Sequence, residues 1–275
     1  MICPRQEWLK DNTLQLYILE TMGVEQDYGL TSPCSHPCCK GCRNECVFSC
    51  RNAEKINKVV NERKKRMAKK EILDNRKYVI EMLKKTGREY IEDLIDEMDR
   101  IGFFTAPCSG GNHLCCEFGL VQHTRNVIEA GEKIGVALLG GEEYNKIQAS
   151  VIICTALHDL GKCGDHGKAL YVPNILKSGK QSEAKPYERN KELPNIPHAF
   201  RSVIIANRWI DLTPDEEYAI MYHDGLYDRE TGGMAVVPGH ETPLLLILHW
   251  ADMWAAHVVE TKTVDKAEET PAESK

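Results

Sequence analysis

The sequence predicts an all-α protein, and three observations lead to this fold class. Residues 51–100 are highly charged and nearly free of glycine and proline, a composition that is typical of helices. Apolar residues between about 101 and 260 recur in blocks that are bounded by helix start and stop signals. No segment of that region alternates convincingly between apolar and polar residues, as a half-buried strand would. We therefore expect a helical bundle, preceded by a small N-terminal cysteine-rich segment.

The overall composition excludes several classes of protein. The 275 residues include 35 lysines and arginines against 41 aspartates and glutamates, and a net charge of −6 does not fit a polycation that coats nucleic acid. The longest aliphatic run, residues 244–248, is far shorter than the ~20 residues of a bilayer-spanning helix, so no membrane partner is expected. Charged residues interrupt the N-terminus before an apolar stretch develops, which argues against a secretory signal. A cytoplasmic location is expected.

Changes in composition along the chain predict four parts. They are an N-terminal helix with a cysteine-rich zinc segment, a charged helical region, a compact helical domain and a disordered tail, over residues 1–52, 53–100, 101–260 and 261–275. The charged region is basic over residues 55–88 and acidic over residues 89–99. A solvated helix face explains this pattern, and the other interpretation is a basic arm that contacts the phosphates of a nucleic acid.

Five helices are expected in the domain over residues 101–260. The second ends at Gly161, since glycine commonly terminates helices. The fourth has the strongest start signal, because Thr213 suits the cap, Pro214 suits the first position and Glu216 follows the cap by three residues. The polar segment over residues 173–197 is expected to be a long loop, of the kind that often forms a lid or binding segment. In order, the expected helices cover residues 120–134, 147–160, 199–210, 214–225 and 243–259.

Each expected helix carries a histidine or an aspartate, and these side chains are candidate metal ligands. Asp252 lies within an apolar run, where a carboxylate is costly to bury unless a partner such as a metal ion balances its charge. Neutral imidazoles and carboxylates together suit several divalent metals without selecting one. An ordinary hydrogen-bonded role is the simpler explanation for any single residue, but the whole set favours a metal site. The set is His123, His158, Asp159, His198, His223 and Asp252.

The same residues carry a resemblance to a known family. Over residues 101–260 the chain resembles the HD-domain superfamily of metal-dependent phosphohydrolases, and it is most similar to the 3′–5′ exoribonuclease-like and uncharacterised phage-type members. One departure is Phe118 before Gly119, where the family usually has two glycines. The matching segments, in H…HD…H…H…D order, are GLVQHT at 119–124, ALHDLGK at 156–162, PH at 197–198, YHDG at 222–225 and LHWAD at 248–252.

The resemblance implies which residues hold metal. One divalent ion (Mn, Fe, Co, Ni, Zn or Mg) would be held by His123, His158, Asp159 and Asp252. His198 and His223 match the ligands of a second ion in binuclear members, where Asp159 would bridge both ions. In members with one metal, the same two histidines face the substrate phosphate, and either could protonate the leaving oxygen.

The resemblance also implies which residues contact substrate. Lys162 matches a lysine that lies near the substrate phosphate, which makes Asp159, Lys162, His198 and His223 the expected catalytic group. His113 matches a histidine near the substrate mouth, and a plain loop histidine is the alternative. Arg201 lies one turn after His198 and is a candidate for phosphate contact, with a surface salt bridge as the alternative. The other histidines, His240, His249 and His257 among them, are expected to be structural or exposed.

The implied activity is hydrolysis of a phosphomonoester or phosphodiester in a nucleotide, or at the end of a single-stranded nucleic acid. The alternative is a nucleic-acid-binding or regulatory protein whose HD site is catalytically silent. The complete ligand set favours the enzyme, because a silent site has no physical reason to keep six polar groups in apolar helices.

Six cysteines lie within one short N-terminal stretch. Clustered cysteines in a reducing compartment bind metal more often than they form disulfides. Four thiolates around zinc would stabilise a segment that is too small for a core of its own. An iron–sulfur cluster and free thiols are the alternatives. The spacing does not select four ligands from Cys34, Cys38, Cys39, Cys42, Cys46 and Cys50.

Overall fold

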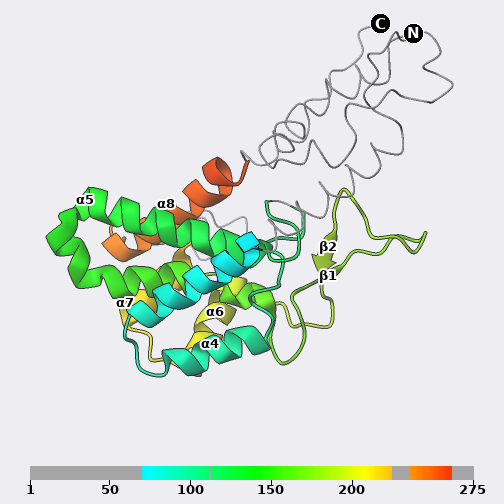
Figure 1. The fold of residues 1–275 in the computed structure, drawn as a ribbon, viewed down its shortest axis with the longest axis horizontal. Helices are drawn as coiled ribbons and strands as arrows, with labels where there is room; N and C mark the ends of the chain where they lie inside the picture. The colour runs from blue at the N-terminus through cyan, green and yellow to red at the C-terminus, as the bar shows by residue number, and fades with distance from the viewer. Residues whose placement is uncertain (1–69, 112, 225–235, 262–275) are drawn as a thin grey trace, which may run out of the picture. The chain divides into compact units, whose positions relative to one another are not determined.

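The computed structural model describes residues 70–111, 113–224 and 236–261. Internal contacts divide the chain into two compact units, Met1–Glu71 and Ile72–Lys275, and apart from residues 70 and 71 the described residues belong to the second. These residues are mostly helical, in agreement with the all-α fold class (Figure 1). The predicted N-terminal helix, the cysteine-rich zinc segment and the tail after Thr261 lie outside the described residues.

The longest element, α5 (Gly119–Leu157), consists of two helical arms that meet at a bend at Gly140 (Figure 1). Gly140 has a φ of +76°, a conformation that glycine adopts without steric cost. The arms approach closely, since a Cβ atom on Gly135 would lie only 2.6 Å from the ring of Tyr144. The two arms correspond to two helices that the sequence predicts separately, and they extend both of those helices to the bend.

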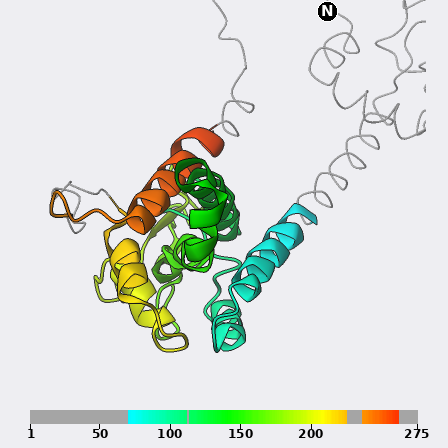
Figure 2. The same cartoon turned by 90° about the vertical axis from the view of Figure 1, so that its left-hand side faces the viewer.

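The other helices pack around α5. α8 contacts both α5 and α7, and α6 contacts α7 and η2. Thr242 caps α8, because its hydroxyl accepts a hydrogen bond from the Leu245 N–H group. Figure 2 shows α8 and the helical residues 72–85 on different sides of α5. The elements are helical residues 70–85, α4 (Ile91–Arg100), the 3₁₀ helix η2 (Leu160–Cys163), α6 (His198–Ala206), α7 (Pro214–Tyr222), α8 (Pro243–Trp254) and the π-helical turn η3 (Ala255–Val259).

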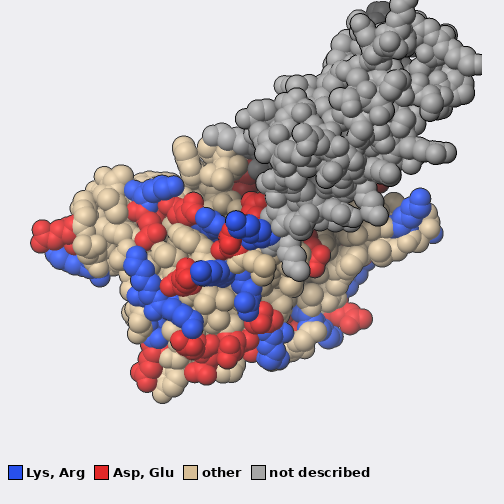
Figure 3. Space-filling view, in the orientation of Figure 1, with Lys and Arg blue, Asp and Glu red and all other residues tan. Residues whose placement is uncertain are grey.

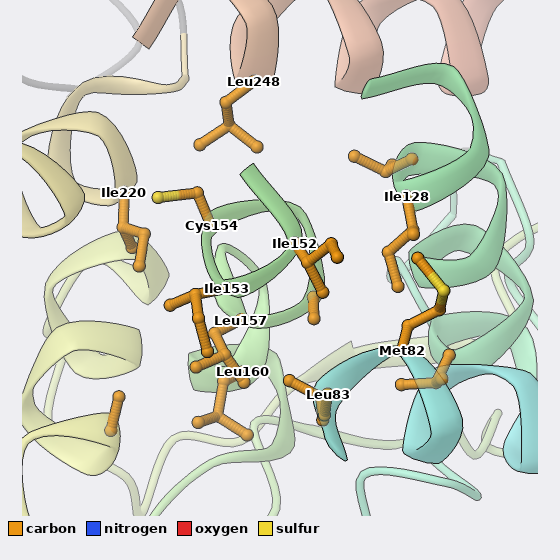
Figure 4. Packing of buried hydrophobic residues seen from close by; sticks show 14 of the residues in the cluster. Met82, Leu83, Ile128, Ile152, Ile153, Cys154, Leu157, Leu160, Ile220 and Leu248 are labelled. Carbon is orange, nitrogen blue, oxygen red and sulfur yellow. The ribbon is translucent and has the colours of Figure 1, made fainter. Parts of the chain in front are cut away.

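A single hydrophobic cluster joins these helices. Leu83 comes from helical residues 70–85, Leu157 from α5, Ile220 from α7 and Leu248 from α8, and all four side chains are completely buried (Figure 4). The described part of the charged region therefore shares one core with the residues after it. This packing holds the ends of α5, α6, α7 and α8 in fixed positions.

The segment between η2 and α6 contains a short hairpin that the sequence analysis did not predict. β1 (Tyr171–Pro173) pairs antiparallel with β2 (Tyr187–Arg189), and Val172 lies opposite Glu188. Strands of three residues are too short to show a period of two in the sequence, which explains why this segment was expected to be a loop throughout.

The described surface carries mixed charge. Figure 3 shows lysine and arginine side chains interspersed with aspartate and glutamate side chains on the visible face. Of the basic arm proposed over residues 55–88, residues 55–69 lie outside the described residues, and residues 70–88 are described. Among the residues that are described, none of the helices combines the length and the apolar composition that a membrane span requires.

The predicted start signal of α7 is present, and it also anchors a distant arginine. The Thr213 hydroxyl accepts from the Glu216 N–H group, and the Glu216 carboxylate accepts from the Thr213 N–H group. Arg88 donates two further hydrogen bonds to that carboxylate, at 2.5 and 3.0 Å. The Glu216 side chain is completely buried, whereas that of Arg88 is 20% exposed. The pair therefore ties the turn before α4 to the start of α7.

Replacing Glu216 with glutamine is expected to lower the free energy of unfolding by about 2–3 kcal/mol at pH 7. Breaking a buried ion pair costs more than this, but Arg88 regains water in the variant. Burial favours the neutral form of Glu216, yet Arg88 holds its pKa below the usual value. Its contribution is therefore complete above a pH of about 4.5 and is lost as the pH falls through the lowered pKa.

Urea denaturation at several pH values measures this effect. Glu81→Gln is the matched control, because Glu81 and its partner Lys77 are 63% and 73% exposed and such pairs contribute little. Equal losses of stability in the two variants at pH 7 would contradict the assignment.

Candidate metal centre

Six side chains from different parts of the chain converge in one cluster. His123 lies on the first arm of α5, and His158 and Asp159 follow the second arm. His198 is the first residue of α6, and His223 follows the last residue of α7. Asp252 lies on α8, two residues before its end. The six candidate ligands are therefore positioned by helix ends and by one buried helix face.

Four of these residues form one group of donor atoms. The Nε2 atom of His123 lies 3.0 Å from Asp252 Oδ1 and 3.5 Å from Asp159 Oδ2. The Nε2 atom of His158 lies 3.4 Å from the same Asp159 oxygen and 3.3 Å from His123 Nε2. The side chains of His123, His158 and Asp159 are almost entirely buried, and that of Asp252 is 25% exposed.

The spacing of these atoms fits a single cation. Ligand atoms that all lie ~2.1 Å from one ion are separated by about 3.0 Å in octahedral and about 3.4 Å in tetrahedral geometry. Five of the six distances among the four donor atoms lie between 3.0 and 3.9 Å, all except the one between the two carboxylates. Without an ion, two carboxylates and two imidazoles at these distances are a costly arrangement to bury.

Hydrogen bonds to the far side of each imidazole leave Nε2 directed at the centre. The Nδ1–H group of His158 donates to the Thr155 carbonyl at 3.0 Å, and that of His223 donates to the Ile220 carbonyl at 2.7 Å. In their neutral form, both rings therefore carry the proton on Nδ1 and a lone pair on Nε2, which is the form that binds metal.

His123 is oriented in the same way by a carboxylate. Its Nδ1 atom lies 2.9 Å from Glu260 Oε1, and Asn126 donates to the same oxygen at 3.0 Å. Burial opposes the charged form of His123, but Asp252 and Glu260 hold its pKa well above the usual value. The centre therefore attracts positive charge at this position, either as a proton on His123 or as a metal ion.

Asp159 belongs to two groups of donor atoms, one with His123 and His158 and one with His198 and His223. Its Oδ1 atom lies 3.2 Å from His198 Nε2, and Lys162 Nζ lies 2.6 Å from its Oδ2 atom. Both oxygens are buried, and neither accepts a hydrogen bond of good geometry from the described residues. Burial favours the neutral carboxyl, but Lys162 and His158 hold the pKa of Asp159 well below its usual range. Asp159 is therefore an ionised carboxylate with unused acceptor capacity.

A second group of donors is formed by Asp159, His198 and His223, whose ligand atoms all lie within 4.8 Å of one another. The rings of His198 and His223 are 5.4 Å apart between centroids. Burial lowers the pKa of His198 to about 3, although Asp159 opposes this shift. His198 is therefore neutral near pH 7, which suits a metal ligand better than the proton donor considered from the sequence.

The centre opens into a cavity of about 330 Å³. Lys162 and His113, both predicted to contact substrate, line this cavity. His249 and His257 line it as well, although the sequence analysis expected both to be structural or exposed. His249 donates from Nδ1 to the His223 carbonyl at 2.8 Å, a contact between α8 and the end of α7 that no spacing in the sequence indicates.

The structure does not support the prediction that Arg201 contacts substrate. Only 1% of Arg201 is exposed, and its guanidinium donates to the Pro194 carbonyl at 2.8 Å and to the Gly161 carbonyl at 3.4 Å. It is not among the residues that line the cavity. The alternative, a surface salt bridge, fails for the same reason. Arg201 instead joins the start of α6 to η2 and to the preceding loop.

Sequence reasoning missed Glu260 and Cys108, both of which lie beside His123. Glu260 is 3% exposed, and Cys108 is completely buried. Glu260 stands at the start of a polar tail, and Cys108 lies in an irregular loop, so no periodic pattern marks either residue as buried. Only the fold brings them to the centre.

The comparisons with known proteins add no relative. No protein-family model, no curated protein and no solved structure matches this chain. The functional conclusions below therefore depend on the residues, distances and burial described above.

Proposed function

We propose that this chain is a metal-dependent phosphohydrolase of the HD-domain type. The observation that carries the proposal is the convergence of six imidazole and carboxylate groups, whose donor atoms form overlapping groups of three within 4.8 Å of one another, beside a cavity that Lys162 lines. These groups occur along the chain in the H…HD…H…H…D order. A buried cluster of this composition suits a divalent ion that acts on a phosphate ester.

The donor groups suggest how one or two cations would be held. His123, His158, Asp159 and Asp252 would bind the first ion, and Asp159, His198 and His223 the second. When bound, a divalent cation supplies a Lewis acid that lets water react as hydroxide near neutral pH and that withdraws charge from phosphoryl oxygens.

The chain's own side chains supply the remaining steps. Lys162 Nζ lines the cavity from a position 2.6 Å from Asp159, so it provides a fixed positive charge for a phosphate oxygen. His249 also lines the cavity, and its hydrogen bond to the His223 carbonyl fixes its ring. An imidazole held in this way can transfer a proton to the leaving oxygen from Nε2 when the ring is in its imidazolium form.

The size of the cavity favours a nucleotide or the end of a nucleic acid as substrate. A volume of about 330 Å³ is at the lower end of the range for small-molecule sites. The cavity lining combines Lys162 and several imidazoles with the apolar Met253 and Ala256. This combination suits a phosphate joined to a flat, partly apolar group.

A substrate panel tests the proposal. The full-length protein is incubated with nucleoside mono-, di- and triphosphates, a chromogenic phosphodiester, and single-stranded RNA and DNA, with Mn²⁺ or with a chelator. We expect hydrolysis in at least one arm, with a loss of at least about 10³-fold when the cation is removed. Cation binding and nucleic-acid binding without hydrolysis of any substrate would instead support the silent-site alternative.

A further inference from the structure

The imidazole rings of the centre form a row in the order His113, His123, His158, His223 and His198. A further set of candidate metal ligands lies at the His113 end of this row. The ring of His113 is 5.2 Å from that of His123 between centroids, and His123 is followed by His158 at 5.4 Å. Cys108 Sγ lies 3.4 Å from His113 Nε2. Cys108, His113 and His123 together offer donor atoms that all lie within 4.8 Å of one another. A thiol is thus placed beside the imidazole that is farthest along the row from His198.

A carboxylate completes this group. Glu260 Oε2 lies 3.6 Å from His113 Nε2. The other oxygen of Glu260 is held by His123 at 2.9 Å and by Asn126 at 3.0 Å. These two contacts hold Oε1 against α5, and Oε2 lies on the side of His113.

Two of the three distances among these donors, those from His113 to Cys108 and to Glu260, match the separations of zinc ligands. Zinc–sulfur bonds of ~2.3 Å and zinc–nitrogen bonds of ~2.05 Å at the tetrahedral angle separate sulfur from nitrogen by about 3.5 Å, and nitrogen from oxygen by about 3.4 Å. The corresponding distances here are 3.4 Å from Cys108 Sγ to His113 Nε2 and 3.6 Å from His113 Nε2 to Glu260 Oε2.

The loop that carries Cys108 and His113 is held by its own hydrogen bonds. The Cys108 N–H group donates to the Leu114 carbonyl at 3.2 Å, and the Ser109 hydroxyl donates to the His113 carbonyl at 2.8 Å. The Leu114 carbonyl oxygen would lie 2.1 Å from a Cβ atom on Gly119, so only glycine permits this approach to α5. The two ligands are therefore preorganised by the backbone.

We propose that Cys108, His113 and Glu260 form an additional cation site for zinc or a similar borderline-soft ion. The site has ligands of its own, so it does not rest on the proposed phosphohydrolase activity. A thiolate and a carboxylate balance one divalent charge, while Lys162, 3.9 Å from Cys108 Sγ, is already paired with Asp159. Binding replaces the thiol proton with the cation and releases that proton to solvent.

The donor types determine which metal ions the site selects, and the positions of the ligands determine which segments a bound ion would join. A thiolate favours Zn²⁺ and Co²⁺ over Mg²⁺, which prefers oxygen ligands. An ion at this position would fasten the loop before α5 to the residue that follows η3. Because Glu260 also holds His123, an ion here would stabilise the orientation of a ligand of the main centre.

Cobalt binding tests the proposal. The full-length protein is stripped of metal, loaded with Co²⁺ and examined by elemental analysis and by its sulfur-to-cobalt charge-transfer absorption. Cys108→Ser is expected to lose one equivalent of Co²⁺ and part of that absorption, and His113→Gln is expected to lose the same equivalent. Cys116→Ser, which changes an exposed cysteine of the same loop, should keep both at the wild-type level.

The variants separate this site from the main centre. In Asp159→Asn, the part of the absorption that depends on Cys108 should persist even though the protein binds less cobalt. Equal cobalt content and equal absorption in the wild type and in Cys108→Ser would overturn the proposal. The same conclusion would follow if Mg²⁺ displaced the Cys108-dependent cobalt at equal concentration.

Discussion

Replacing Asp159 with asparagine is expected to lower the rate of the proposed phosphoester hydrolysis by at least about 10³-fold and to reduce the metal content of the protein. Asp159 contributes to both groups of donors, since its Oδ2 atom lies 3.4 Å from His158 Nε2 and its Oδ1 atom lies 3.2 Å from His198 Nε2. Asparagine keeps the size of the side chain but loses its negative charge. Elemental analysis and rates measured with saturating Mn²⁺ check the expectation.

The matched control is Asp211→Asn, which removes one negative charge from an exposed position outside the cavity. This variant should keep wild-type activity and metal content. Circular dichroism should show wild-type helix content in both variants, because the Asp159 side chain contributes no helix cap. A wild-type rate and metal content in Asp159→Asn would contradict the proposed centre.

Replacing Gly161 with alanine is expected to lower the free energy of unfolding by about 3 kcal/mol, at the upper end of the range for overpacked sites. A Cβ atom at this position would lie 2.1 Å from the His198 carbonyl oxygen and 2.9 Å from the Ser202 amide nitrogen. The Gly161 N–H group also donates to Ser202 Oγ at 2.8 Å, and Ser202 donates onward to the His158 carbonyl at 2.7 Å. Relief of the collision therefore requires α6 to move away from the end of α5.

The same movement would displace His198 from Asp159, so the variant should also lose affinity for the second cation. Gly141→Ala is the control, since a Cβ atom there meets nothing within 4 Å and its φ is not in the left-handed region. Alanine at position 141 should leave stability unchanged or raise it by up to about 1 kcal/mol. Urea denaturation of both variants measures the difference, and equal stabilities would show that α6 does not pack as described.

The helices were largely predictable because their signals are local. Thr213, Pro214 and Glu216 identify the start of α7, and the structure shows the predicted capping box. Pro243 likewise occupies the first turn of α8. The hairpin of β1 and β2 could not be predicted in the same way, because three-residue strands carry no detectable period.

The candidate ligands were predictable for a different reason. A histidine or aspartate within an apolar helix conflicts with its surroundings, and that conflict is visible in the sequence around His158 and Asp252. Glu260 and Cys108 show no such conflict, because their neighbours in the chain are polar or irregular. Arg201 was assigned to substrate from its distance to His198 along the helix, whereas its burial against backbone carbonyls depends on the packing of α6 against η2.

The sequence by itself determined the helical fold class, the starts of α7 and α8, and the set of polar residues that the helices carry. Tertiary structure alone decided that Arg88 pairs with Glu216 across 128 positions of chain, and that Gly161 is needed for the close approach of α6 rather than as a helix stop. It also decided that six side chains meet within the reach of one or two cations. The physical reason is that caps and periodicity act over one or two turns, whereas burial and donor spacing depend on which helices pack together.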